Sequence, residues 1–326
     1  MKRIFVTGGG GYVGSSLIPR LLNDNFKVIV LDLFIYGEEV LKPHKNLTII
    51  KGDIRNQDLL RSIIKDNDIV IHLACISNDP SFELNPNLGK SINLESFEPF
   101  VKICIENKVQ RFIYASSSSV YGVKKELNVT EEKSLEPLTD YSKFKAECEL
   151  ILHKYSSKNF TPVTLRPATV CGYSPRQRLD VVVNILTNLG YHKGEISVFG
   201  GKQLRPNIHI SDMVNAYLAI VNSKTEDVHD QIFNVGFENK QVIEIADLVK
   251  KNIDRNIIIN VEKSIDDRSY HISSDKIKKV LNFQPKKSID DAVKDITYAF
   301  EKKILVNTFN NDNYFNIKKM QNIKLK

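Results

Sequence analysis

The sequence has 326 residues, of which 42% are hydrophobic and 26% are charged, with only 15 glycines and 11 prolines. That balance is typical of a chain that buries a large core, and it excludes a disordered or fibrous protein. The net charge is +7, but six lysines against two acids in residues 301–326 contribute +4 of it, so the rest of the chain lacks the dense basic stripe of a nucleic-acid-binding surface.

Cysteine and histidine spacing gives no sign of a metal site. The four cysteines are widely separated without a C-x-x-C pair, and the seven histidines form no H-x-x-x-H pair. We therefore expect no bound metal and four reduced thiols, with Cys171 a buried, unreactive one. No apolar stretch approaches the roughly 18 residues that cross a bilayer. We expect a cytoplasmic protein with neither a membrane nor a nucleic acid as partner.

Short β-branched runs alternate with helical patterns through the first half of the chain. Several of these runs are apolar throughout, as strands covered by helices on both faces are. The pattern predicts an α/β fold with a doubly wound parallel sheet, whose ligands lie beyond the carboxyl ends of the strands. The six expected strands are residues 3–7, 27–31, 47–50, 68–73, 111–115 and 162–165.

The pattern changes after residue 166, and at about 150 residues per domain the length itself predicts two domains. We expect helices at 179–189, from Ser211 or Asp212, and at 242–251, 274–281 and 289–302, with strands at 196–199, 231–235 and 257–261. These elements predict a smaller, interleaved C-terminal α/β lobe. The expected division is 1–172 and 206–236 for the first domain, 173–205 and 237–302 for the lobe, and 303–326 for a loosely held basic tail.

A glycine-rich run, TGGGGYVG at residues 7–14, joins the first strand directly to a helix. It fits G-x-G-x-x-G and also G-x-x-G-x-x-G, and its context between two regular elements disfavours a flexible linker. Glycine lets a pyrophosphate approach the amides at a helix N-terminus. The run therefore predicts a dinucleotide site that includes Gly8, Gly11, Tyr12, Val13 and Gly14.

Asp32 ends the second strand, 18 residues after Gly14. A carboxylate about 20 residues after the glycines accepts hydrogen bonds from the adenosine ribose and repels a 2′-phosphate. Residues 33–37 contain no arginine that would attract one, so NAD is favoured over NADP; the alternative is a carboxylate that only begins a polar turn. Asp53 and Ile54 after the third strand are candidates for holding the adenine, and here a turn carboxylate is nearly as good an explanation.

Tyr141 and Lys145 stand at positions i and i+4 of a predicted helix, so they share one face. The ammonium would lower the pKa of the phenol, ordinarily near ~10, toward that of a usable base. The alternative is a solvated helix face. Ser116 to Ser119 follow the fifth strand, where at least one hydroxyl is a candidate donor to a reacting group and a plain polar loop is the alternative.

These residues together resemble the extended short-chain dehydrogenase/reductase superfamily, specifically its NAD-dependent epimerase/dehydratase family, which acts on nucleotide sugars and has a Rossmann-type fold. The resemblance extends from residue 2 to about residue 300. It is carried by T-G-x-x-G-x-x-G, Asp32, Gly52-Asp53-Ile54, His72-Leu73-Ala74, Asn93, Ser-Ser-x-x-Val-Tyr-Gly, Tyr141 with Lys145, Leu165-Arg166-Pro167 and Arg205-Pro206-Asn207-Ile208-His209.

The resemblance implies a catalytic set of Ser117, Tyr141 and Lys145. Tyr141 would remove a proton from a sugar hydroxyl, usually at C4, while hydride passes to NAD, and Leu73, Ala74 and Pro167 would complete the cofactor site. Dehydratases of the family carry an Asp-Glu pair where this chain has Ser118-Ser119, which disfavours dehydration. A 4-epimerase is the leading hypothesis. A C4 dehydrogenase or ketoreductase is the same-site alternative, and a catalytically silent NAD-binding scaffold is a third.

The resemblance also implies recognition of a nucleotide-diphosphate sugar by arginines, whose planar fork bonds two phosphate oxygens. Each arginine could instead form an ion pair at the surface, and Asn78 could instead cap a turn. Residues 165–184 are similar to a subgroup from bacterial surface-polysaccharide clusters that includes heptose C4 dehydrogenases. A homodimer is implied through helices at 94–107 and 141–155, with core packing as the alternative. The candidate substrate residues are Asn78, Ser117, Ser118, Arg176, Arg178, Arg205 and Arg268.

Overall fold

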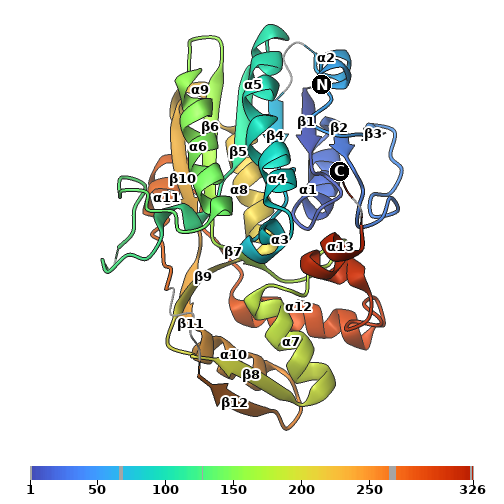
Figure 1. Ribbon diagram of the computed structural model, residues 1–326, viewed down its shortest axis with the longest axis vertical. Helices are drawn as coiled ribbons and strands as arrows, with labels where there is room; N and C mark the ends of the chain where they lie inside the picture. Colours follow the sequence, from blue (N-terminus) through green and yellow to red (C-terminus); the bar gives the residue numbers. More distant parts are fainter. Residues whose placement is uncertain (1, 66–68, 127, 264–268, 324, 326) are drawn as a thin grey trace.

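The computed structural model describes residues 2–65, 69–126, 128–263, 269–323 and 325 (Figure 1). Its largest element is a seven-stranded sheet of order β10-β6-β5-β4-β1-β2-β3, in which all neighbours are parallel. The expected doubly wound sheet is confirmed, and the 231–235 segment adds its seventh strand. Asp68, the first residue of the fourth expected strand, lies outside the described residues. The strands are β1 (Arg3–Thr7), β2 (Lys27–Asp32), β3 (Leu47–Lys51), β4 (Ile69–His72), β5 (Arg111–Ala115), β6 (Thr161–Pro167) and β10 (Gln231–Val235).

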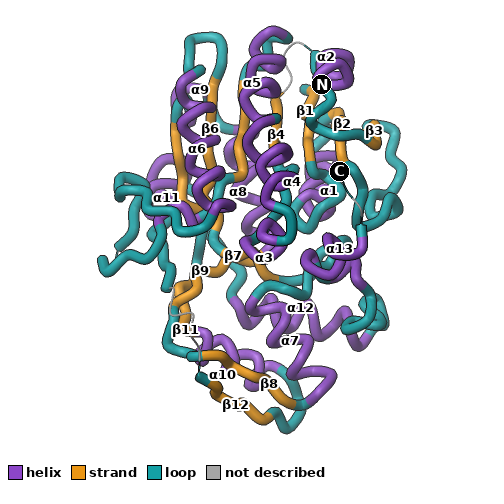
Figure 2. Tube along the Cα trace, viewed as in Figure 1, coloured by secondary structure: helices purple, strands orange, loops and turns teal. Residues whose placement is uncertain are grey.

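Alternate residues of the central strands point into two separate apolar clusters, as the two-residue period of a strand requires. Ile4 and Val6 of β1 pack in one cluster and Phe5 in the other, all three fully buried. Helices α1 and α8 cover the first face, and α2, α5 and α6 cover the second (Figure 2). The helices of this part are α1 (Gly14–Asn23), α2 (Gln57–Ile63), α3 (Asp79–Glu83), α4 (Pro86–Lys90), α5 (Phe97–Glu106), α6 (Asp140–Lys154), α8 (Ile210–Asn222) and α9 (Thr225–Val228), with short turns η1 (Ser91–Glu95) and η2 (Ser118–Tyr121).

Two small sheets and four helices make up most of the rest. Strands β11-β9-β7 form one sheet and β12-β8 the other, while α7, α10 and α12 pack together around a third apolar cluster. Strands β7, β9 and β11 were not expected from the sequence, and the helix expected from residue 179 begins three residues later. The elements are β7 (Thr169–Cys171), α7 (Val182–Lys193), β8 (Glu195–Phe199), β9 (Leu204–His209), β11 (Glu238–Gln241), α10 (Val242–Asn252), β12 (Ile258–Glu262), α11 (Asp275–Leu281) and α12 (Ile289–Glu301).

The expectation of a loosely held tail is wrong for most of residues 303–325. Turn η3 (Asp312–Tyr314) and helix α13 (Asn316–Asn322) lie at the junction between the large sheet and the α7/α12 region (Figure 1). Met320 and Leu325 pack against the cluster that contains Phe5, and Asn316 is buried. The segment is held because its few apolar side chains and one asparagine find partners on the folded body, which local composition does not reveal.

The described part of the chain contains no helix long and apolar enough to cross a bilayer. Nor do its described histidine, cysteine, aspartate and glutamate side chains form any group of three that could hold a metal ion.

Candidate active site

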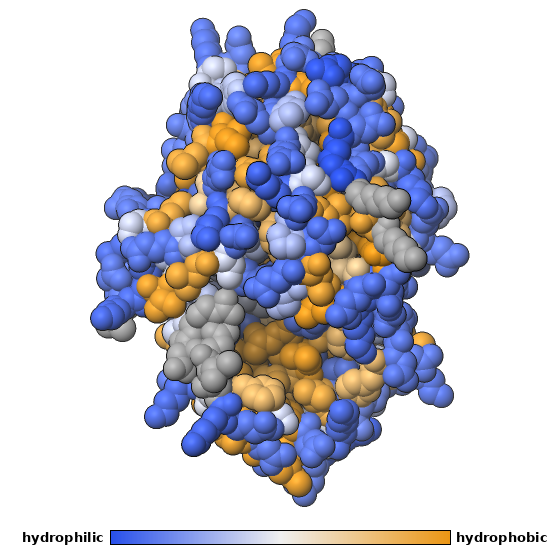
Figure 3. Space-filling view, viewed as in Figure 1, coloured by the Kyte–Doolittle hydropathy of each residue, from blue (hydrophilic) through white to orange (hydrophobic). Residues whose placement is uncertain are grey.

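One cavity of about 440 Å³ opens at the carboxyl ends of the central strands, and in the space-filling view apolar surface gathers in the hollow between the two parts of the molecule (Figure 3). Nineteen of the twenty site residues expected from the sequence line it, and the twentieth, Arg268, lies outside the described residues. The lining residues among them are Gly8, Gly11, Tyr12, Val13, Gly14, Asp32, Asp53, Ile54, Leu73, Ala74, Asn78, Ser117, Ser118, Tyr141, Lys145, Pro167, Arg176, Arg178 and Arg205.

The glycine run forms a tight loop that no other residue type would allow. Gly8 has a φ of +75°, and a Cβ there would lie 2.5 Å from the backbone nitrogen of Ala74. A Cβ on Gly14 would lie 2.6 Å from the carbonyl oxygen of Gly8. The first turn of α1 carries no acidic residue, so its positive end faces the cavity unopposed. The loop therefore fits the pyrophosphate of a dinucleotide.

Tyr12 fixes this loop to the second part of the molecule. Its hydroxyl donates to the Gly172 carbonyl at 2.6 Å and accepts from Asn184 Nδ2 at 3.0 Å, while Ser174 Oγ donates to the Tyr12 carbonyl at 2.7 Å. Burial raises the pKa of Tyr12 above its ordinary value, so the phenol stays protonated. The side chain of Tyr12 therefore anchors the loop.

Asp32 and Asp53 differ in how free their carboxylates are. Asp32 accepts from the backbone nitrogens of Gly10 at 2.8 Å and Phe34 at 2.6 Å, and burial raises its pKa against the lowering effect of those bonds. Asp53 forms an ion pair with Arg55 at 2.6 Å. Burial raises the pKa of Asp53, but the hydrogen bonds from Arg55 outweigh this effect and lower that pKa overall. The structure thus favours Asp32 as the ribose ligand and the turn explanation for Asp53.

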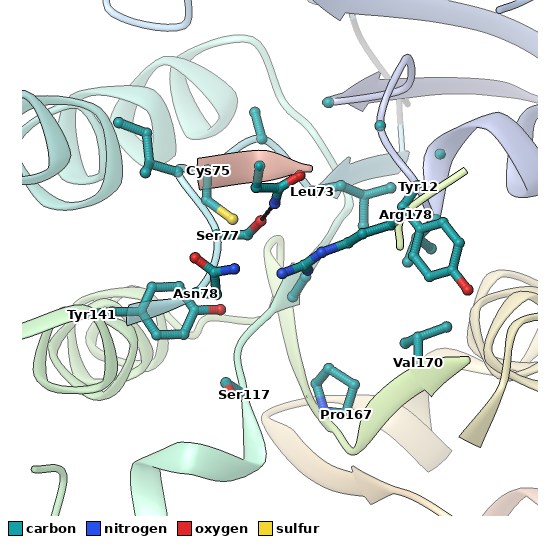
Figure 4. A pocket seen from close by; sticks show the side chains of 18 of the residues that line it. Tyr12, Leu73, Cys75, Ser77, Asn78, Ser117, Tyr141, Pro167, Val170 and Arg178 are labelled. Carbon is teal, nitrogen blue, oxygen red and sulfur yellow. Dashed lines mark hydrogen bonds between the residues drawn. The ribbon is translucent and has the colours of Figure 1, made fainter. Parts of the chain in front are cut away.

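Tyr141, Ser117 and Asn78 meet at the other end of the cavity. Figure 4 shows the phenol of Tyr141 directed into the cavity, with Asn78 on one side of it and Ser117 on the other. Thr139 caps α6, which places Tyr141 in the first helical turn, and the Ser117 hydroxyl hydrogen-bonds to the phenol and to Ser119 Oγ at 2.8 Å. Asn78 also caps α3 by accepting from the Ser81 nitrogen at 3.0 Å, so the turn explanation and the pocket position both hold for it.

The pKa of Tyr141 shifts in the direction opposite to the one expected. Burial raises it well above the ordinary value, and the positive charge of Arg178 and the hydrogen bond from Ser117 only partly oppose this rise. Lys145 Nζ lies 5.8 Å from the Tyr141 ring centroid and donates to the Ala115 carbonyl at 2.6 Å. The expectation that Lys145 acidifies the phenol is therefore wrong for this structure, because removal of water from the phenolate dominates.

A buried ion pair that the sequence analysis missed supports the serine loop. Glu149 and Arg166 are each 3% exposed and are joined at 2.6 Å. Glu149 also accepts from the Ser116 hydroxyl, and Arg166 donates to Tyr121 at 2.7 Å. The sequence signal that could have pointed to Glu149 is its position four residues after Lys145, which places both residues on the same face of the helix.

The arginines occupy different ends of the cavity. Arg178 extends toward Asn78 across its centre (Figure 4) and donates from Nε to Asp180 at 2.6 Å. Arg205 lies 5.4 Å from the Tyr270 ring centroid. Arg176, which was expected beside the substrate, instead stacks over Tyr36 at 3.4 Å on the side of Asp32. The sequence analysis also missed further lining residues, Cys75, Tyr217, Tyr270, Asn316 and Leu325.

A parallel sheet with a glycine-lined cradle at one end of its cavity and a tyrosine, lysine and serine at the other defines a dinucleotide-dependent α/β enzyme. Comparison with known proteins gives the family. The chain belongs to the NAD dependent epimerase/dehydratase family, whose model matches residues 4–236. It is therefore an NAD-dependent enzyme, and the cradle around Gly8, Gly14 and Asp32 fits that cofactor.

Relatives in this family have several activities. The chain is 30% identical over 308 residues to the uncharacterized UDP-glucose epimerase YtcB of Bacillus subtilis, covering 89% of this chain and 95% of that protein. It is 27% identical over 315 residues to dTDP-D-glucose 4,6-dehydratase of Bos taurus, covering 90% of this chain and 87% of that protein. The structure of UDP-glucuronic acid 4-epimerase from Bacillus cereus with UDP-glucuronic acid and NAD superposes with a TM-score of 0.81 at 25% identity, covering 93% of this chain and 100% of that one.

Proposed function

We propose that the protein is a nucleotide-sugar 4-epimerase, which oxidises the sugar C4 hydroxyl to a 4-keto intermediate and reduces it again from the other face, in the biosynthesis of surface-polysaccharide sugars. The observation that carries the proposal is the meeting of Tyr141, Ser117 and Asn78 at one end of a cavity whose other end fits NAD. The names of the relatives, UDP-glucose epimerase and UDP-glucuronic acid 4-epimerase, support a UDP-sugar as substrate.

Bound NAD supplies the hydride acceptor and returns the hydride. Tyr141 Oη exchanges the proton of the C4 hydroxyl, and Ser117 Oγ, held by Ser119, hydrogen-bonds to the same oxygen. Lys145 lies one turn below Tyr141, where its ammonium can reach a ribose hydroxyl of the cofactor. The raised pKa of Tyr141 keeps the phenol protonated at rest, which is the form that donates a proton to the 4-keto oxygen in the second half-reaction. The first half-reaction requires the phenolate, so the phenol first releases its proton to solvent, and the positive charge of Arg178 favours that release.

Dehydration is disfavoured by the side chains that line the cavity. Its described carboxylates are Asp32 and Asp53 at the adenosine end and Asp79, which accepts from Thr139 Oγ1 at 2.6 Å. Ser118 and Ser119 cannot replace an acid/base pair that removes water. A C4 dehydrogenase or ketoreductase uses the same residues and stays the alternative.

We place the nucleotide diphosphate between Arg178 and Arg205, which line the cavity from segments outside the large sheet, with Asn78 and Ser118 near the sugar. The resemblance adds Arg268. The domain boundaries at 172/173, 205/206 and 236/237 follow from the same assignment, with NAD bound by the larger domain and the nucleotide sugar by the smaller lobe.

We further propose a cytoplasmic homodimer that packs through α5 and α6. The two helices contact each other on one face of the large sheet, and their outer side carries exposed apolar residues. Leu150 is 71% exposed and Ile105 is 36% exposed. Large apolar side chains that stand out from neighbouring helices are typical of an interface.

The test is a panel of UDP-, GDP-, CDP- and dTDP-sugars incubated with the purified protein and followed by NMR and by absorbance at 340 nm. An epimerase gives a C4 epimer with no lasting absorbance change, whereas stoichiometric NADH identifies a dehydrogenase. Tyr141→Phe is expected to lower kcat by at least 100-fold while NAD still binds. The matched control is Tyr155→Phe, since Tyr155 ends the same helix and bonds Glu98 instead. Full turnover by Tyr141→Phe would exclude the assigned proton transfer.

A further inference from the structure

Asn316, the first residue of α13, lies at the mouth of the cavity and is 3% exposed. Its side-chain oxygen accepts from Arg176 at 2.6 Å, and its Nδ2 donates to Ser77 Oγ at 2.7 Å. Its backbone nitrogen donates to Asp180 Oδ2 at 2.6 Å. One residue near the chain end thus joins the loop after β4 to the arginine-bearing segment before α7.

Two of the three described arginines that line the cavity, Arg176 and Arg178, are connected to this residue. Arg176 bonds it directly, and Arg178 bonds Asp180 through Nε at 2.6 Å, on the oxygen that Asn316 leaves free. The dashed contact between Ser77 and its partner is visible in Figure 4 above the guanidinium of Arg178. If α13 were absent, Arg176 would lose a hydrogen-bond partner, and Asp180, the partner of Arg178, would lose one of its own donors.

Arg176 has an unused hydrogen-bond donor at the adenosine end of the cavity. Its side chain is buried and lines the cavity, yet its Nε has no hydrogen-bond partner. It stacks on Tyr36, and its positive charge acts on Asp32. Burial lowers the pKa of Arg176 to about 10, which leaves it charged at neutral pH. A buried cation with an unused donor is satisfied by an oxygen-rich, anionic group.

Packing keeps α13 in place. Met320 and Leu325 lie against the apolar cluster under the sheet, and Leu325 also lines the cavity. The segment therefore forms part of the cavity wall as well as part of its hydrogen-bond network.

We propose that the start of α13, together with Leu325, is part of the active site and that Asn316 is a positioning residue. It holds Arg176 against the adenosine diphosphate portion of NAD, and through Asp180 it holds Arg178 against the nucleotide sugar. The second half of this statement rests on the proposed function. The first half concerns cofactor binding alone.

The experiment is a double-mutant cycle on NAD binding, measured by titration of the full-length protein. Arg176→Leu and Asn316→Ala are each expected to weaken NAD binding by about tenfold, since each removes a charge-assisted contact. Because both act through one guanidinium, the double variant is expected to bind no more weakly than Arg176→Leu alone. Additive losses would overturn the proposal, because they would show that Asn316 acts elsewhere.

Two further variants separate positioning from folding. Asn322→Ala on the same helix, whose side chain bonds Asp312 at the surface, is expected to leave NAD binding unchanged. Asn316→Asp keeps the acceptor for Arg176 and is expected to bind NAD within about threefold of the parent protein. A tenfold loss in either would overturn the proposal.

The substrate half is tested separately. Arg178→Leu is expected to raise the KM for the nucleotide sugar at least tenfold without changing NAD affinity. A protein that binds NAD with the expected cycle but turns over no nucleotide sugar would refute the proposed function and leave the cofactor half of this inference intact.

Discussion

Glu149→Gln tests the ion pair behind the serine loop. The substitution keeps the shape of the side chain but removes the charge that faces Arg166, which approaches at 2.6 Å through one guanidinium nitrogen and at 3.0 and 3.1 Å through Nε. Breaking one partner of a buried pair costs about 3–5 kcal/mol, because the other charge stays buried without compensation. With an unfolding entropy of about 2.1 cal/mol/K per residue, a chain of 326 residues would then melt about 4–7 °C lower.

Calorimetry or a fluorescence melt of the full chain measures this shift. Glu147→Gln is the matched control, since Glu147 lies on the same helix and is exposed; it is expected to change the melting temperature by less than about 1 °C. The double variant Glu149→Leu/Arg166→Met removes both charges and is expected to recover most of the loss. Equal melting temperatures for Glu149→Gln and Glu147→Gln would refute the reasoning, because the pair would then contribute no net stability.

Two other predictions concern the pH dependence of the folding stability and the oligomeric state. His72 is buried, and its pKa is lowered from 6.5 to about 3, mainly by burial and to a lesser extent by the positive charge of Lys145. Between these pH values the imidazole is therefore protonated in the unfolded chain and neutral in the folded chain. The contribution of His72 to the free energy of unfolding is therefore present above pH 6.5 and is lost as the pH falls toward 3, by on the order of 5 kcal/mol in total. In urea unfolding, the His72→Phe variant should lose less stability over this pH range than the parent protein does. An unchanged dependence of stability on pH would contradict the prediction. Leu150→Glu is expected to convert the proposed dimer to a 37.2 kDa monomer in light scattering, and a parent protein that is already monomeric would contradict the dimer.

The large sheet could be predicted because most of its strands are short runs rich in β-branched and apolar residues that alternate with helical patterns along the chain. The strands β7, β9 and β11 could not be predicted, because β7 has only three residues and polar residues make up half of β9 and all of β11. β11 consists of Glu-Asn-Lys-Gln and pairs antiparallel with Leu204 to Asn207 of β9. Its strand conformation comes from the neighbouring backbone, which a local pattern does not contain.

The candidate site divides in the same way. The glycine loop, Asp32, Tyr141 and Lys145 were predictable, because each motif requires certain residue types at a fixed spacing. The direction of the Tyr141 pKa was not, since it depends on how much water the folded cavity excludes. The position of Arg176 and the role of Asn316 were not predictable either, because those two residues are 140 positions apart and meet only through packing.

The division between predictable and unpredictable residues has a functional meaning. Most residues that fit NAD lie on the large sheet and its first loops, and the family to which the chain belongs includes both epimerases and dehydratases. Under the proposed function, we therefore expect the residues that distinguish one sugar or one outcome from another on the remaining walls. These walls include three segments, Ser77 to Asp79, Arg176 to Arg178 and the start of α13, together with Arg205 and Tyr270. These three segments are joined by Asn316, so a change in any one of them alters the geometry of the other two. Under the proposed function, we expect specificity to depend on their network, so that exchanging a single arginine for that of a relative transfers a contact without transferring the substrate preference.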